Sequence, residues 1–312
     1  MLLELAAVAI VVVLTLLFFA RSFSATRDPI ANKHVVITGG SSGIGLALAQ
    51  EMLTQSKPKK ITLVARNTEG LTKAKTCLNS DSRVDVLSLD VAKFSACKAA
   101  SEGPLADADV LVNAAGLSIP GKLEDLTESE IDTMVKVNLL GSVNLTKCLI
   151  GRMKARKSGH VVFVSSQAGQ IGLYGFTVYS ATKFALRGLA EALRMETVAH
   201  GVDVSLVFPA DTETPGLAKE SERKPKITKL LSETSGVMTA DAVARLIHQG
   251  MRERKFLITV NLDGWMLNML SLGMAVSGFW SLVSEVLLLP ILRVVGVGYS
   301  LYFDRVVRKN DV

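Results

Sequence analysis

Short runs of β-branched and apolar residues alternate with longer helical patterns through most of this 312-residue chain. Seven runs between residues 33 and 264 have the composition of strands: HVVIT, KITLVA, VDVLSLD, DVLVNAAG, HVVFVSS, DVSLVFPA and KFLITV. Alternation of this kind indicates parallel strands joined by right-handed crossovers, in an open sheet that helices cover on both faces. We therefore predict that residues 33–264 form one doubly wound α/β domain with a parallel sheet.

An uncharged apolar run occupies residues 5–20, and Arg21, Arg27 and Lys33 follow it. Its length approaches the roughly 20 residues that a membrane-spanning helix needs. A cleaved signal peptide usually begins with positive charges, whereas Glu4 precedes this run, so we predict a retained transmembrane anchor over residues 1–25. Cleavage near Ala25 is the alternative. Positive charges on the C-terminal side of an anchor predict that the following domain faces the cytoplasm.

A second apolar region lies beyond Gly264. Twenty residues, WMLNMLSLGMAVSGFWSLVS, carry no charge, and the next stretch is interrupted by Glu285, Pro290 and Arg293. The first stretch could span a bilayer, and the two together could form a hairpin or an interfacial patch. A helical arm buried against a second copy of the chain is the alternative. Residues 265–312 are therefore predicted to be an apolar, membrane-associated C-terminal segment. A homo-oligomer is also compatible with this sequence.

Composition limits the partners of the domain. The net charge of +6 suits an anionic partner, such as a phosphorylated cofactor or a lipid surface, but no long basic run with interleaved aromatic residues occurs. We therefore expect no binding of nucleic acid. Cys77, Cys97 and Cys148 have neither metal-like nor paired spacing, so neither a metal site nor a disulfide framework is predicted.

The first predicted strand leads into a glycine-rich turn, TGGSSGIG, which opens the helical pattern IGLALAQEML. Glycines permit a tight turn at this position and let backbone N–H groups and the helix N-terminus approach a pyrophosphate. The serine hydroxyls can add donors. The candidate cofactor-binding residues of the turn are Gly39, Ser41, Ser42, Gly43, Ile44 and Gly45.

The second predicted strand ends in LVARN. A fold of this kind that prefers NAD presents an acid there to the ribose 2′-hydroxyl, but this chain presents Arg66. A guanidinium can bind a 2′-phosphate through two hydrogen bonds, so NADPH is the predicted cofactor. A solvated surface arginine is the alternative.

Tyr179 and Lys183 occur in YSATK, four residues apart, which places both side chains on one face of a helix. A nearby ammonium favours the phenolate and is predicted to lower the pKa of Tyr179, as suits a proton donor to a developing alkoxide. Ser166 ends the predicted strand VVFVSS. Its hydroxyl can hydrogen-bond a substrate carbonyl.

These motifs together, TGGSSGIG, NAAG, VVFVSS and YSATK, resemble those of the short-chain dehydrogenase/reductase family. The resemblance implies a carbonyl reductase in which Ser166, thirteen positions before Tyr179, acts in preference to Ser165. It implies that Asn138, in MVKVNLLGS, holds a water linking Lys183 to solvent, with a purely structural role as the alternative.

The resemblance also implies further cofactor contacts. The residues concerned are Asp90 and Val91 beside the adenine, Asn113 of NAAG, and Thr214 of FPADTETPG at the carboxamide. Relatives carry a second basic residue where Gly70 stands, and Lys73 is the nearest candidate here.

A closer resemblance, to a membrane-bound lipid-ketone reductase within this family, covers nearly the whole chain, including both apolar ends. It implies reduction of a long-chain lipid ketone by NADPH at the endoplasmic reticulum membrane, with the catalytic domain in the cytoplasm. The motifs alone indicate carbonyl reduction. A membrane-bound enzyme acting on steroids, retinoids or other lipid carbonyls, or a non-catalytic lipid-binding scaffold, are the alternatives.

Overall fold

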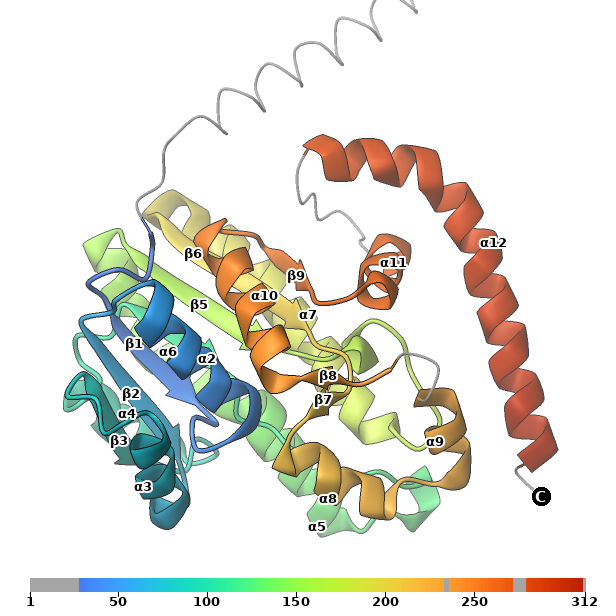
Figure 1. Cartoon of the computed structure of the whole chain (residues 1–312), viewed down its shortest axis with the longest axis horizontal. Helices are drawn as coiled ribbons and strands as arrows, with labels where there is room; N and C mark the ends of the chain where they lie inside the picture. Colours follow the sequence, from blue (N-terminus) through green and yellow to red (C-terminus); the bar gives the residue numbers. More distant parts are fainter. Residues whose placement is uncertain (1–27, 233–235, 272–278, 311–312) are drawn as a thin grey trace, which may run out of the picture.

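The computed structural model describes residues 28–232, 236–271 and 279–310 (Figure 1). The predicted anchor over residues 1–25 lies outside the described residues. The described part is built around one seven-stranded sheet, to which all seven predicted runs contribute a strand.

All seven strands are parallel, and their order is β3-β2-β1-β4-β5-β6-β9. The strands are β1 (His34–Thr38), β2 (Lys60–Ala65), β3 (Val84–Ser88), β4 (Val110–Asn113), β5 (Gly159–Val164), β6 (Val202–Phe208) and β9 (Leu257–Thr259). The doubly wound α/β fold predicted from the sequence is confirmed.

Three helices cover each face of the sheet. One face carries α2 (Gly43–Gln55), α3 (Thr68–Cys77) and α10 (Ala240–Arg252), and the other carries α4 (Phe94–Glu102), α6 (Gly141–Arg156) and α7 (Thr177–Thr197). Each group has its own apolar core. Leu48, Met52 and Ile247 lie in the first core, and Leu145, Leu149 and Leu186 lie in the second; all are buried.

The strand order reverses between β1 and β4, which makes this point the topological switch of the sheet. Thr38 pairs with Asn113, and Asn113 pairs with Phe163, so the carboxyl ends of β1, β4 and β5 lie at one edge. Ligands of open α/β sheets bind in the crevice at this place. The fold therefore brings the three motif-bearing loops together.

A small excursion follows β6. Two-residue strands β7 (Thr212–Glu213) and β8 (Met238–Thr239) pair in parallel, and α8 (Pro215–Arg223) and α9 (Lys226–Ser232) lie between them in the sequence. The polar, mixed-charge sequence of this stretch suits either a mobile lid or an ordinary solvated loop and helix. It forms two short helices at the mouth of the carboxyl-end crevice (Figure 1).

The C-terminal region contains α11 (Leu262–Ser271) and α12 (Phe279–Asn310). Trp265, Met266 and Leu270 of α11 pack against the core, so the boundary predicted at Gly264 falls inside a helix of the catalytic domain. Of the uncharged stretch over residues 265–284, the described residues belong to α11 and to the start of α12, and residues 272–278 lie outside the described part.

Helix α12 runs beside α9 and α11 (Figure 1). Among the described helices, Leu282–Asn310 is the candidate for a membrane span, with a mean hydropathy of 1.8 and only 6% of its most apolar window buried. Length and composition alone make it so, and the core helix of a soluble protein can pass the same test. One side of α12 packs against the domain, and the other side is exposed.

Candidate active site

A cavity of about 1200 Å³ opens at the carboxyl ends of the strands. It extends from the glycine-rich turn after β1, past Ser166 and Tyr179, to α11 and α12. Most of the residues predicted for the site line it: Gly39, Ser41, Ser42, Gly43, Ile44, Gly45, Arg66, Asp90, Val91, Ser166, Tyr179, Lys183 and Thr214. One chamber thus joins the predicted cofactor and catalytic groups.

At three positions of the turn after β1, only glycine can be accommodated. Gly39 has φ +68°, and an added Cβ would lie 2.8 Å from the Ala114 carbonyl oxygen. Gly43 has φ +56°, and its added Cβ would lie 2.9 Å from Thr214 Cγ2; at Gly45 the added Cβ would lie 2.5 Å from the Gly39 oxygen. Without side chains at these positions, the backbone N–H groups at the start of α2 are accessible to a pyrophosphate.

Arg66 follows β2 directly, and its exposed side chain lines the cavity. Its position is fixed through the backbone, because the Ser88 hydroxyl donates to the Arg66 carbonyl oxygen at 3.0 Å. Lys73 does not share this place: it forms an exposed ion pair with Glu69 at 2.7 Å. Arg66 is therefore the basic residue available at the tip of β2.

Asn113 differs from its predicted place. Its buried side chain donates to Thr146 Oγ1 of α6 at 3.1 Å, and it does not line the cavity. Successive side chains of a strand point to opposite faces, and this one faces α6. At the end of β4, Ala114, Ala115 and Gly116 form the cavity wall instead.

Asp90 and Val91 lie at the cavity edge beyond β3. The Asp90 carboxylate accepts from the Ala92 N–H at 3.1 Å, which shapes the turn. The Val91 carbonyl oxygen accepts from Asn144 Nδ2 of α6 at 3.0 Å. These contacts hold the turn in place and leave both residues on the cavity wall.

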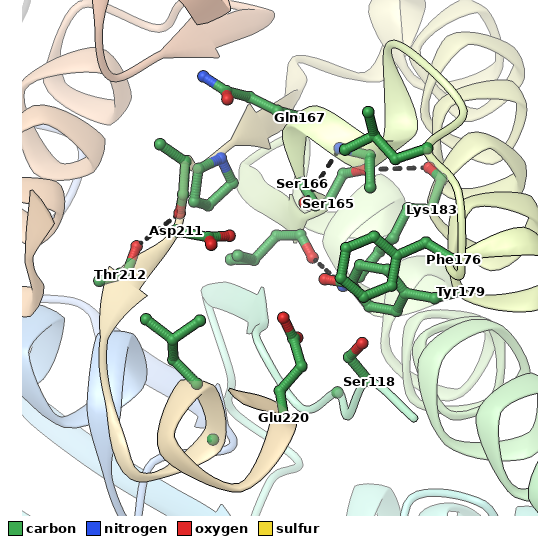
Figure 2. A pocket seen from close by; sticks show the side chains of 18 of the residues that line it. Ser118, Ser165, Ser166, Gln167, Phe176, Tyr179, Lys183, Asp211, Thr212 and Glu220 are labelled. Atoms are coloured by element: carbon green, nitrogen blue, oxygen red, sulfur yellow. Dashed lines mark hydrogen bonds between the residues drawn. The ribbon is translucent and has the colours of Figure 1, made fainter. Parts of the chain in front are cut away.

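The two serines at the end of β5 have different roles. Ser165 is buried and donates to the Lys183 carbonyl oxygen at 2.9 Å, which ties β5 to α7. Ser166 accepts from the Ala168 N–H at 3.1 Å and hydrogen-bonds the Tyr179 side chain. Figure 2 shows Ser166, Tyr179 and Lys183 converging in the cavity. Ser166 is therefore the serine whose side chain contacts the tyrosine.

Lys183 lies one helical turn beyond Tyr179 on α7. Its Nζ is 5.6 Å from the centre of the Tyr179 ring and donates to the Val164 carbonyl oxygen at 3.0 Å. Burial lowers the pKa of Lys183 to about 8. The ammonium is thus held next to the phenol ring, and its pKa lies near physiological pH.

The pKa of Tyr179 is raised above its ordinary value, opposite to the direction predicted from the sequence. Burial is the largest cause, and the negative charges of Glu220 and Asp211 add to it, whereas the hydrogen bond with Ser166 acts in the other direction. Lys183 directs its hydrogen bond to Val164 rather than to the phenol. Tyr179 therefore keeps its proton at neutral pH, as a proton donor requires.

Asn138 is fully buried in a π-helical turn, Val135–Leu140, between α5 (Glu128–Met134) and α6. Its Oδ1 accepts from the Leu117 N–H and its Nδ2 donates to the Leu117 carbonyl oxygen, both at 2.9 Å. A Cβ added to Gly116 would lie 3.4 Å from both Asn138 Oδ1 and Lys183 Nζ. Asn138 thus fixes the loop after β4 beside the lysine, and π-turns often mark functional sites.

Three charged residues of the site escaped sequence reasoning: Asp211, Glu220 and Lys224. Lys224 Nζ lies 2.8 Å from Asp211 Oδ2 and 2.9 Å from Glu220 Oε1. The segment reads as an ordinary polar helix, and only the i, i+4 spacing of Glu220 and Lys224 pointed to a pair. Their position beside Tyr179 depends on the tertiary fold.

The fold and this set of groups define a reductase of the short-chain type. The sequence matches the short chain dehydrogenase family over residues 33–225, and the chain belongs to this family. It is 42% identical to the 3-ketodihydrosphingosine reductase of Bos taurus, over 97% of this chain and 94% of that protein. It is 41% identical to the 3-dehydrosphinganine reductase of Danio rerio, over 99% and 96%.

Solved structures share the fold of the catalytic domain. A short-chain dehydrogenase from Sphingobium yanoikuyae in complex with NADPH superposes with a TM-score of 0.65 at 26% identity. The match covers 74% of this chain and 88% of that one. Membership of the family therefore indicates oxidoreductase chemistry with a dinucleotide cofactor. Evidence for the particular substrate has to come from features outside the family domain.

Proposed function

We propose that this protein reduces the 3-keto group of 3-ketosphinganine (3-ketodihydrosphingosine) to sphinganine with NADPH, in sphingolipid biosynthesis. The observation that carries the proposal is the similarity to reductases named for this activity, at 41–42% identity over 97% or more of the chain. That similarity extends beyond the family domain, which ends at residue 225, into the apolar C-terminal region.

NADPH fits the residues that are present. The glycines of the turn give its backbone close access, and Arg66 supplies a guanidinium for the 2′-phosphate at the tip of β2. When bound, the cofactor supplies a hydride to the carbonyl carbon of the substrate. The Thr214 hydroxyl accepts from the Leu217 N–H at 3.1 Å, so the residue proposed for the carboxamide is itself fixed as the cap of α8.

The protein groups handle the oxygen of the substrate. Ser166 and Tyr179 share a hydrogen bond and can both approach a carbonyl oxygen placed between them. The Ser166 hydroxyl stabilises the charge that develops on that oxygen, and Tyr179 donates its proton to it. Lys183 places a positive charge below the ring, and Asn138 holds the loop through which we propose a water replenishes the proton.

The substrate's long alkyl chain has a place in the outer part of the cavity. Leu267 and Leu270 of α11 and Leu292, Val295 and Phe303 of α12 line it. The last three lie at helical spacing and form one stripe along α12. An apolar chain that leaves the catalytic groups in this direction is covered by apolar side chains and shielded from water.

The opposite side of α12 suits a membrane surface. Leu287, Ile291, Val294 and Leu301 follow helical spacing on this side and are 62–73% exposed. We propose that this face contacts the bilayer of the endoplasmic reticulum, and that residues 1–25 form a second attachment. A substrate that stays in the bilayer then reaches the cavity without crossing water.

We propose a cytoplasmic catalytic domain, which the N-glycosylation acceptor sequence Asn144-Leu145-Thr146 can test. Asn144 Nδ2 donates to the Val91 carbonyl oxygen, so a folded cytoplasmic domain leaves this nitrogen unmodified. In sealed microsomes we expect no N-glycan and full digestion of the domain by added protease. A glycan at Asn144, or protection from protease, would place the domain in the lumen.

The substrate assignment is tested by comparing purified enzyme on 3-ketosphinganine and on a steroid ketone, each with NADPH. We expect sphinganine as the product and a kcat/KM at least about tenfold higher for the sphingoid ketone, because a steroid lacks its polar head group. A preference for the steroid would favour a membrane-bound reductase of other lipid carbonyls. Turnover of neither ketone would favour the scaffold alternative.

A further inference from the structure

Asp211, Glu220 and Lys224 form a charged group, the 211/220/224 cluster, and its two carboxylate residues line the cavity together with Tyr179. Lys224 contacts Oδ2 of Asp211 at 2.8 Å and Oε1 of Glu220 at 2.9 Å. The lysine side chain is only 4% exposed and that of Glu220 only 12%. Figure 2 shows Glu220 and Asp211 pointing toward the space in front of Tyr179.

The cluster has an excess of negative charge. It contains two carboxylates and one ammonium, and Lys224 contacts only one oxygen of each carboxylate. Buried carboxylates are stable when cations and hydrogen-bond donors satisfy them. Burial, with the neighbouring Asp211, raises the pKa of Glu220 although Lys224 opposes the shift. The cluster can therefore accept a second cation.

An unsatisfied hydroxyl lies at the same end of the cavity. Ser118, in the loop after β4, lines the cavity, and within the part of the chain that the structure describes its buried Oγ lies near the Glu220 carboxylate without forming a well-aligned hydrogen bond. Figure 2 shows Ser118 next to Glu220, with its hydroxyl directed toward the space below Tyr179. A buried polar atom without a partner calls for a ligand group that can hydrogen-bond it.

We infer that Glu220, with Asp211 beside it, binds a positively charged amine on the carbon next to the reacting ketone. The inference rests on the proposed function, because 3-ketosphinganine is a ketone with an amino group at carbon 2 and a hydroxyl at carbon 1. Its ammonium meets the free carboxylate oxygens, and its hydroxyl meets Ser118.

The position of the cluster agrees with this chemistry. The carbonyl oxygen is held by Ser166 and Tyr179, and the amine is attached to the adjacent carbon, so its partner must lie in the same chamber. Glu220 fulfils this condition, because it lines the same cavity as Ser166 and Tyr179. A steroid or retinoid carbonyl has no ammonium for this pair of carboxylates, which makes the cluster a determinant of substrate specificity.

The test compares two substrates on three proteins. The full-length wild type, Glu220→Gln and Glu222→Gln are assayed with NADPH on 3-ketosphinganine and on its 2-deamino analogue, which keeps the chain, the 3-ketone and the 1-hydroxyl. Glu222 lies on the same helix and is exposed, so its variant matches the change in charge. Melting temperature and NADPH binding are measured for each protein.

We expect the wild type to prefer the amino ketone by about 10- to 100-fold in kcat/KM, the range of one charge-assisted hydrogen bond. Glu220→Gln should lose most of this preference, mainly through a higher KM for the amino ketone, with the deamino ketone nearly unaffected. Glu222→Gln should behave as the wild type does.

Two results would overturn the inference. Equal use of both ketones by the wild type would exclude amine recognition, and this result does not depend on any variant. An equal loss on both substrates in Glu220→Gln would mean that the residue acts only through structure or through Tyr179. If the wild type reduces neither ketone, the proposed function fails instead, and the two failures are thereby distinguished.

Discussion

Lys183 Nζ donates a hydrogen bond to the carbonyl oxygen of Val164 at 3.0 Å. The bond joins the first third of α7 to the last residue of β5, immediately before Ser165 and Ser166. Two groups proposed to act in catalysis, Ser166 and Lys183, are 17 positions apart in the sequence and are thereby held in a fixed relation. The same burial that holds the lysine makes its charge sensitive to pH.

The rate of ketone reduction should fall in alkaline solution. Burial lowers the pKa of Lys183 to about 8, so its ammonium is present below that pH and is lost as the pH rises through it. We expect kcat to decline by about tenfold per pH unit above pH 8 as the positive charge below Tyr179 disappears. Lys183→Arg, which stays charged, should lack this decline even if its turnover is lower. A flat wild-type profile up to pH 10 would disprove this assignment.

Arg66→Ala should remove the preference for NADPH. Loss of one charge-assisted contact to the 2′-phosphate is expected to raise the KM for NADPH by about 10- to 100-fold and to leave the KM for NADH nearly unchanged. Lys73→Ala is the matched control, because Lys73 is paired with Glu69 on the exposed side of α3. Equal efficiency of the wild type with both cofactors, measured by initial rates, would show that Arg66 does not select the phosphate.

Gly43→Ala should weaken NADPH binding. The new Cβ would lie 2.9 Å from Thr214 Cγ2, at a backbone with φ +56°, and left-handed geometry costs a side chain about 1–2 kcal/mol. We expect a Kd for NADPH raised by about tenfold or more in fluorescence titration. Gly188→Ala is the control: Gly188 lies inside α7 with open space around it, so alanine should raise the melting temperature slightly without changing the Kd. An unchanged Kd in Gly43→Ala would contradict the proposed role of the turn.

The strands could be predicted because each is a short apolar run bounded by polar or glycine-rich residues. HVVIT and KITLVA coincide with β1 and β2 residue for residue. The runs at β3 and β4 were expected to continue as far as Asp90 and Gly116, but the strands end at Ser88 and Asn113. The chain leaves the sheet at these residues and lines the cavity, and strand propensity cannot predict where this happens.

Features that depend on contacts between distant segments could not be predicted. The strands β7 and β8 have two residues each, and 24 residues separate Glu213 from Met238. Segments this short have no periodic pattern from which a strand could be predicted. The π-turn that carries Asn138 has the composition of an ordinary helix. The direction of the Asn113 side chain follows from the register of β4, and the negative surroundings of Tyr179 follow from the folding of α8 over the cavity.

Formation of sphinganine by the Tyr179→Phe variant is the measurement that tests the account most directly. Purified wild type and variant are incubated with 3-ketosphinganine and NADPH, and sphinganine is quantified by mass spectrometry, with NADPH binding and melting temperature as controls for folding. The variant keeps the ring that packs against Phe176 at 5.5 Å and lacks only the proton donor. We predict NADPH binding close to that of the wild type and a kcat about 10²- to 10⁴-fold lower, the usual contribution of general acid catalysis. Near-normal sphinganine formation by Tyr179→Phe, or none by the wild type, would contradict the account.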